Sequence, residues 1–116
     1  DGGTLTLELE SDALKAGWMQ KKGEKTLFKS TSWQHRFFVL VWSDSSLSER
    51  EIRYYDSQDY CSRKQKGVID LSRATEVKQV EIEGGAGLAI ETPGRLWELL
   101  PPTLEAAAEW WRLLNQ

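Results

Sequence analysis

Cations gather in the first third of the chain, at a spacing that suits the binding of an anion. Residues 15–42 hold six lysines and arginines against one glutamate, a charge of +5. The net charge of the whole chain is −3, so the remaining residues together carry −8. Alternate side chains of a strand share a face, which would put Lys21 of one strand beside Gln34 and Arg36 of the next. Because a buried unpaired cation is costly, we expect these groups to face an open cleft that takes an anion such as a phosphate. The alternative is that Lys21 and Arg36 pair with nearby carboxylates such as Glu24.

Catalytic and metal-binding sets cannot be assembled from the remaining residues. His35 is the only histidine and Cys61 the only cysteine, which leaves no metal-ligand cluster and no nucleophile–base set. The glycine-rich stretch 84–87 precedes a predicted strand rather than a helix, unlike a dinucleotide-binding loop. We therefore expect no enzyme activity and no cofactor, and we expect His35 to be an ordinary surface or groove residue.

Length and composition indicate one globular domain. The chain has 116 residues, of which 40% are hydrophobic and 28% charged. A single cysteine forms no intrachain disulfide, which favours a reducing, cytoplasmic setting, and the longest apolar run, 37–42, is too short to span a bilayer. The net charge of −3 argues against nucleic acid as a partner. The chain begins with Asp1, so we expect a piece of a larger protein that is monomeric as an isolated domain.

The hydrophobic pattern predicts a mainly β protein with one helix at its end. The glycine-rich stretch 84–87 and ThrProGly at 92–94 are predicted turns, and 43–48 is a further turn region. Thr103 is placed to cap a helix that runs to about Asn115 with Trp110 in its apolar stripe. The predicted strands are 16–22, 33–42, 50–56, 67–71, 75–82 with a bulge between Val77 and Val80, 88–92 and 95–100, and residues 4–9 form either a further strand or an extended tail.

An ordered set of segments resembles the pleckstrin homology (PH) domain. The segments are AGWMQK (16–21), WQHRFFVL (33–40), YY (54–55), KGVIDL (66–71) and, in the closing helix, EWW (109–111). The resemblance covers residues 14–116 and leaves 1–13 as an N-terminal extension, an extra strand or a tail. It implies a seven-stranded, bent antiparallel barrel or sandwich that one C-terminal α-helix caps, with Trp110 as the tryptophan that the family keeps in this helix.

The resemblance also implies a ligand. PH domains that bind phosphoinositides use the loop between the first two strands, with a basic residue late in the first strand and a basic pair opening the second. Lys21 and Arg36 match this pattern, whereas Gln34 stands where the pair would have its first cation, which predicts modest affinity. Other members contact phosphate just before the fourth strand or from the third. The implied phosphoinositide-binding residues are Lys21, Lys22, Lys25, Arg36, Lys66 and Tyr54.

The loop between the first two strands carries two apolar residues between lysines. Leu27 and Phe28 would enter the headgroup layer of a membrane while Lys25 and Lys29 meet anionic phosphates, a combination typical of peripheral membrane binding. We therefore predict that Leu27, Phe28 and Lys29 form a membrane-inserting tip. The alternative is that the two apolar side chains fold back onto the end of the barrel or cover Trp33.

Two functions fit these observations. The first is a non-catalytic signalling or adaptor module that binds phosphoinositide headgroups on the inner face of membranes. The second is a protein-interaction module that docks a small GTPase, or another part of its own protein, with little lipid binding. The second would use the acidic remainder of the chain or exposed tryptophans such as Trp18, Trp42 and Trp111.

Overall fold

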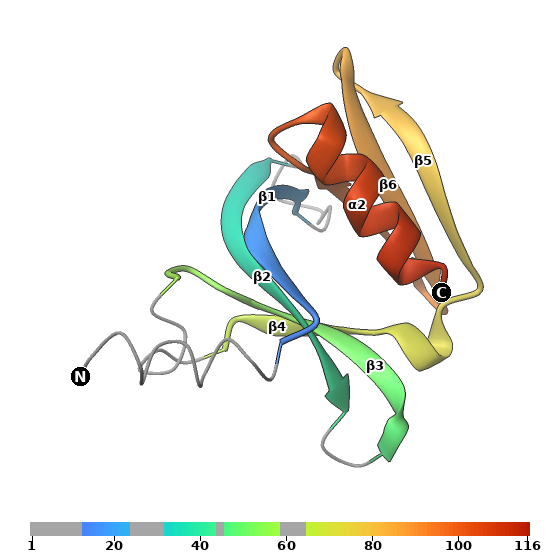
Figure 1. The fold of residues 1–116 in the computed structure, drawn as a ribbon. Coiled ribbons are helices and arrows are strands. Elements are labelled where there is room, and N and C mark those ends of the chain that lie inside the picture. The colour runs from blue at the N-terminus through green and yellow to red at the C-terminus, as the bar shows by residue number, and fades with distance from the viewer. Residues whose placement is uncertain (1–12, 24–31, 44–45, 59–64) are drawn as a thin grey trace. The chain divides into compact units, whose positions relative to one another are not determined.

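The computed structural model describes residues 13–23, 32–43, 46–58 and 65–116. Residues 4–9, predicted to form a strand or an extended tail, lie outside the described residues. Within them, seven strands form one antiparallel sheet in the order β4-β3-β2-β1-β7-β6-β5 (Figure 1). The elements are β1 (Lys15–Lys22), β2 (Trp33–Ser43), β3 (Ser46–Tyr55), β4 (Gly67–Asp70), the short 3-10 helix η2 (Leu71–Arg73), β5 (Glu76–Ile82), β6 (Gly85–Thr92), β7 (Arg95–Leu100) and α2 (Leu104–Leu114).

The chain divides into two compact units, and β1 and β2 contribute residues to both. One unit holds Asp1–Gly17 and Phe37–Ser72. In it β3 pairs with β2 on one side and with β4 on the other, so that Ile52 lies opposite Leu40 and Ile69. All three side chains are fully buried. The alternation of apolar residues that the sequence shows in these strands therefore does mark the core face.

The other unit holds Trp18–Arg36 and Arg73–Gln116 and contains α2 with β5, β6 and β7. Helix α2 packs on β5 and β6 (Figure 1). Thr103 caps its first turn, since the Thr103 hydroxyl accepts a hydrogen bond of 3.0 Å from the Ala106 N–H. Ala107, Trp110 and Leu114 are its buried residues. The cap, the apolar stripe and the end of the helix at Asn115 agree with the sequence prediction.

Two predictions about β5 and β6 are wrong. The register runs without a shift from Glu76 opposite Glu91 to Ile82 opposite Gly85, so β5 has no bulge between Val77 and Val80. The two valines are three positions apart, so in a regular strand they point to opposite faces. The turn before β6 is also tighter than predicted, since it consists of Glu83 and Gly84 with φ of 48° and 81°. Such a two-residue turn with positive φ matches the twist of an antiparallel pair.

The start of β3 also differs from the prediction. The sequence places it at residue 50, but the strand begins at Ser46 and pairs with the end of β2 at Ser43. The register shifts between Trp42 and Ser43. The added residues, 46–49, are SLSE and contain a single apolar residue, so a search for apolar alternation does not find them.

Candidate functional site

The first hairpin closes at a neck formed by Gly23 and Ser32. The Gly23 N–H donates a hydrogen bond of 2.7 Å to the Ser32 carbonyl, at the two ends of the loop between β1 and β2. Gln34 lies beside this neck, because a side chain at Gly23 would meet the Gln34 amide nitrogen at 3.7 Å. The structure therefore forms the predicted hairpin and places Gln34 at its loop end.

Lys21 lies near this end, but it is buried rather than open to a cleft. Only 5% of its surface is exposed. The register sets Lys21 opposite Leu99 of β7, which is fully buried, so the lysine points to the core face of the sheet. Its ammonium lies 5.9 Å from the centroid of the Trp97 ring, a distance at which the ring face attracts a cation. The expectation of an open cleft at Lys21 is wrong because residues of β7 cover this position.

Trp97 carries a second cation on the same ring. The guanidinium carbon of Arg95 lies 3.5 Å from the ring centroid, a stacking distance that suits the planar guanidinium. The Trp97 indole N–H donates to the Thr92 hydroxyl at 3.2 Å, and this hydroxyl donates to the Arg95 carbonyl at 3.2 Å. The ring is thus held from the turn between β6 and β7, and it brings together a lysine and an arginine that are far apart in the sequence.

Sequence reasoning missed Arg95 and Trp97. The alternation of Arg95, Trp97 and Leu99 on one face of a strand is visible in the sequence. The missing information is that β7 pairs with β1, with Gln20 opposite Leu100 and Lys21 opposite Leu99. This register sets the β6–β7 turn at the same end of the sheet as the loop of the first hairpin, and so adds Arg95 to the predicted cations.

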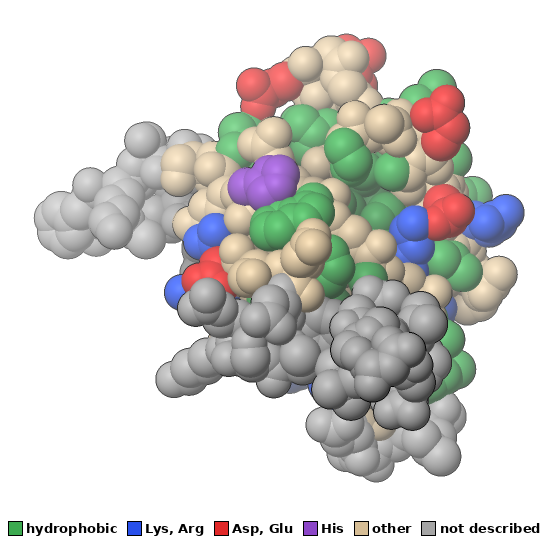
Figure 2. Space-filling model, turned by 60° about the vertical axis from the view of Figure 1, so that its left-hand side comes forward, with side chains coloured by type: hydrophobic (Ala, Val, Ile, Leu, Met, Phe, Trp, Pro, Cys, Tyr) green, Lys and Arg blue, Asp and Glu red, His purple; other side chains and the backbone are tan. Residues whose placement is uncertain are grey.

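Arg36 and His35 differ in exposure, as alternation requires. Arg36 is partly buried, and its Nη1 donates a hydrogen bond of 2.9 Å to the His35 carbonyl. His35 is exposed, and its ring lies 4.6 Å from that of Trp18, centroid to centroid, with a tilt of 32°. Figure 2 shows the histidine beside hydrophobic side chains on the surface. His35 is therefore a surface residue, one of the two places that the sequence analysis allowed it.

Lys22 points away from Lys21 and has a carboxylate partner. Its Nζ lies 3.7 Å from Glu98 Oε1, and the two side chains are 38% and 30% exposed. The sequence analysis proposed carboxylate partners for Lys21 and Arg36 but not for Lys22, and the partner of Lys22 comes from β7.

Comparison with known proteins identifies the family. The PH domain family model matches residues 13–116. The chain belongs to the PH domain family. Comparison with curated proteins finds no match.

Solved PH domains share the fold of this chain. The C-terminal PH domain of pleckstrin in complex with D-myo-Ins(1,2,3,5,6)P5 has a TM-score of 0.70 and 23% identity, over 89% of this chain and 92% of that one. The Slm1 PH domain in complex with phosphoserine has a TM-score of 0.68 and 15% identity, over 90% and 93%. The PH domain of human TBC1 domain family member 2 protein has a TM-score of 0.65 and 22% identity, over 87% and 76%. PH domains are in general binding modules for lipids or proteins rather than catalysts.

Two further residues of the predicted PH-domain site lie in the unit of β3 and β4. The half-exposed Lys66 has its Nζ 3.8 Å from Asp56 Oδ2. Tyr54 is only 7% exposed, and its ring centroid lies 5.5 Å from that of Phe38. The tyrosine lies so close to Gly67 that a side chain there would collide with it. Tyr54 is thus a packing residue, and a phosphate contact from it or from Lys66 stays a prediction.

The remaining predicted residues of this PH domain are those of the loop and the exposed tryptophans. Lys25, Leu27, Phe28 and Lys29 lie outside the described residues. Trp42 and Trp111 are 42% and 38% exposed, as expected, and Trp18 is partly buried against His35. No helix among the described residues is long and apolar enough to cross a membrane.

Proposed function

We propose that this PH domain binds the phosphorylated headgroup of a phosphoinositide at the loop end of its first hairpin. The observation that carries the proposal is the pair of cations on the Trp97 ring, Lys21 at 5.9 Å and Arg95 at 3.5 Å. The partly exposed Arg95 would contact an anion directly, and the buried Lys21 would add its positive charge to the electrostatic potential at the site. Arg36 of β2 is the third cation of the proposed site.

The ligands of structural neighbours support phosphate as the anion. The C-terminal PH domain of pleckstrin was solved with an inositol pentakisphosphate, and the Slm1 PH domain with phosphoserine. Both ligands present phosphate oxygens, which guanidinium and ammonium groups bind through charge-assisted hydrogen bonds. A phosphoinositide headgroup offers several such groups on one ring.

Gln34 sets the expected strength of binding. Its neutral amide lies at the neck of the hairpin beside Gly23. The PH-domain pattern that Lys21 and Arg36 match has a cation at this position. A charge-assisted hydrogen bond is roughly twice as strong as a neutral one. We therefore propose micromolar affinity with loose selectivity among headgroups, which corresponds to about −8 kcal/mol at 1 μM.

Membrane attachment would add contacts from the loop between β1 and β2. We propose that Leu27 and Phe28 insert at the headgroup layer, with Lys25 and Lys29 on anionic lipids, so that the domain acts as a peripheral signalling or adaptor module at the cytoplasmic face. Replacing Leu27 and Phe28 by aspartate should then weaken binding to vesicles and leave binding of a soluble inositol phosphate unchanged. An equal loss for both ligands would mean that the two residues brace the loop from within.

Sedimentation with vesicles tests the lipid site directly. Phosphatidylcholine vesicles with and without a phosphoinositide are compared for the wild type and for the variants Lys21→Met, Arg36→Gln and Arg95→Gln. Arg73→Gln is the matched control, because it removes one exposed cation from η2. We expect phosphoinositide-dependent binding that falls at high salt and that the three site variants, but not the control, reduce at least about tenfold.

Calorimetry with a soluble inositol phosphate separates the headgroup from the bilayer. Equal sedimentation of the site variants and the control, together with no heat from the soluble ligand, would contradict the proposal. The protein-interaction alternative would then stand alone. The exposed Trp42 and Trp111 favour that second function, since exposed tryptophan is enriched at interfaces.

A further inference from the structure

The outward face of β5, β6 and β7 contains an apolar hollow of about 270 Å³. It exists because β6 presents small side chains to this side. Leu88 and Ile90 point to the buried face, whereas Gly87 and Ala89, which alternate with them, point outward. Larger side chains flank this low floor, Val80 from β5 and Leu96 from β7.

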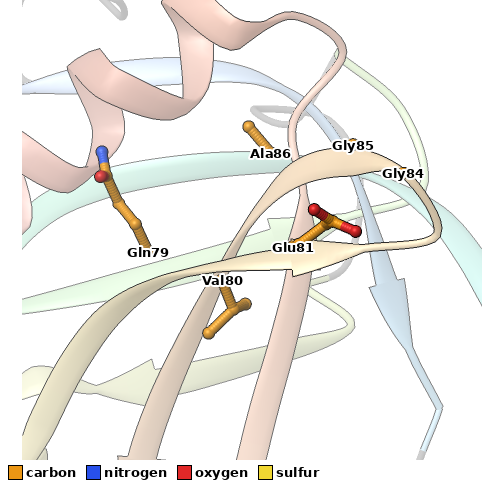
Figure 3. A pocket seen from close by; sticks show the side chains of 6 residues that line it. All are labelled: Gln79, Val80, Glu81, Gly84, Gly85 and Ala86. Atoms are coloured by element: carbon orange, nitrogen blue, oxygen red, sulfur yellow. The ribbon is translucent and has the colours of Figure 1, made fainter.

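The hollow lies on the face opposite to the one that α2 covers. Figure 3, drawn for a neighbouring hollow at the β5–β6 turn, shows Val80 pointing away from the side on which Gln79 and Ala86 lie. Leu96 is 55% exposed at the edge of the hollow. Ile82 fills the end of it, since its side chain lies over Gly87, where any side chain would collide with it. An apolar surface of this kind gains free energy when a partner removes it from water.

Carboxylates form the rim of the hollow. Glu76, Glu91 and Glu98 line it together with one cation, Lys78. Lys78 lies 3.1 Å from Glu76, and Glu98 lies 3.7 Å from Lys22, while Glu91 accepts a hydrogen bond of 3.2 Å from the Thr75 hydroxyl. With Glu81, which also lines the hollow, the lining holds four glutamates against one lysine, or −3. The rim therefore keeps a negative charge that suits a cationic partner.

Strand β5 gives the hollow an open side. It ends the sheet order, and no strand of the described part of the chain pairs with its outer edge (Figure 1). A peptide segment can therefore enter the hollow from this side and run across the outward faces of β5, β6 and β7.

We propose that this face docks an extended, basic peptide segment of a partner protein. An aliphatic side chain of the segment occupies the hollow between Val80 and Leu96, and its flanking lysines or arginines meet Glu91 and Glu98. The segment runs across the three strands and leaves the hollow over the open side at β5. This interaction uses a different face from the phosphate site and does not require an anion to be bound there.

Titration with three synthetic peptides tests the proposal. The probe has a central leucine between pairs of arginines, a second peptide has serine in place of the leucine, and a third has glutamates in place of the arginines. We expect saturable binding of the first peptide in calorimetry, binding several-fold weaker for the second, and no binding of the third.

Protein variants locate the binding on the surface. Glu91→Lys should weaken the leucine peptide roughly tenfold, whereas Glu49→Lys, the same charge reversal at an exposed position of β3, should change it little. Leu96→Ser should weaken the leucine peptide but not the serine peptide, whereas Leu104→Ser, at a leucine 70% exposed, should affect neither. Thermal melts of each variant check the fold.

Three results would overturn the proposal. If Glu91→Lys and Glu49→Lys weaken binding of the leucine peptide equally, the peptide is attracted by the negative charge of the whole domain and not by the rim of the hollow. Equal binding of the leucine and serine peptides would show that no aliphatic side chain of the peptide occupies the hollow. Sedimentation velocity could also show that the domain dimerises and that Leu96→Ser abolishes the dimer. A second copy of this chain, and not a peptide of a partner protein, would then occupy the hollow.

Discussion

Two regions of the same unit use strand β7 in opposite ways. On one face Trp97 gathers the cations Lys21 and Arg95. On the other face, Leu96 and Glu98 border a hollow with an acidic rim. The two regions take alternate residues of one strand, so neighbours in the sequence serve surfaces of opposite charge. Net charge alone, −3 for the chain, hides this division.

The two regions also differ in how they hold their charges. The cations at the loop end lie against an aromatic ring that is only 9% exposed and that hydrogen bonds hold in place. The carboxylates of the outer face stand in exposed ion pairs around small side chains. We therefore expect single substitutions to have larger effects at the loop end than on the outer face.

The substitution with the largest expected effect destabilises the fold and so disrupts both regions. Trp110→Ala deletes a side chain that is 1% exposed in α2, which should cost about 3–5 kcal/mol of the free energy of unfolding. That loss is a large part of the stability of an ordinary domain. Chemical denaturation measures it, and Trp111→Ala, at a residue 38% exposed, should stay within about 1 kcal/mol of the wild type. Similar stability of the two variants would show that Trp110 does not anchor the helix in the core.

The next effect separates the two regions. Lys21→Met keeps the length of the buried side chain and removes its charge, so inositol phosphate binding should weaken at least about tenfold. Binding of the basic leucine peptide should stay the same, because Lys21 points to the other face. Calorimetry with both ligands on one protein preparation makes the comparison. A parallel loss of both ligands would show that the two regions are not independent.

A smaller effect concerns the ring that organises the cations. Trp97→Leu should weaken inositol phosphate binding several-fold, and Trp97→Phe less, because phenylalanine keeps part of the cation–π attraction. If the ring acts by positioning Lys21, Trp97→Leu should cost little further affinity in a Lys21→Met background. Strictly additive losses in this double-mutant cycle would restrict Trp97 to a packing role.

The smallest effect sharpens the basic region instead of breaking it. Gln34→Lys restores the cation that the family pattern has at this position and should tighten headgroup binding several-fold. The structure places Gln34 beside Gly23 at the hairpin neck, on the strand face that Arg36 also takes. Calorimetry that finds no gain would move the phosphate away from this end of the hairpin.

Local patterns in the sequence predict most of the fold but only part of the site. Alternation of apolar residues marks β2 and β7, and helical spacing with a threonine cap marks α2, because these features depend on near neighbours in the chain. The pairing of β1 with β7 joins residues about eighty positions apart, and no short window of sequence contains it. The ring of Trp97 near Lys21 and the pairing of Lys22 with Glu98 depend on that long-range register. The hollow beside Leu96 depends on the pairing of β5 with β6 and of β6 with β7.

The pairing of Lys22 with Glu98 joins the two proposed ligands thermodynamically. If the predicted contact of Lys22 with a headgroup forms, an anion that draws Lys22 away would leave Glu98 available to a basic peptide, and a peptide that takes Glu98 would release Lys22 for the anion. Each ligand would then raise the affinity of the other by the same factor, as linkage requires. An exposed ion pair contributes about 0–1 kcal/mol, so this cooperativity has a ceiling of roughly fivefold. A domain built in this way would hold a partner best where that partner and an anionic membrane occur together.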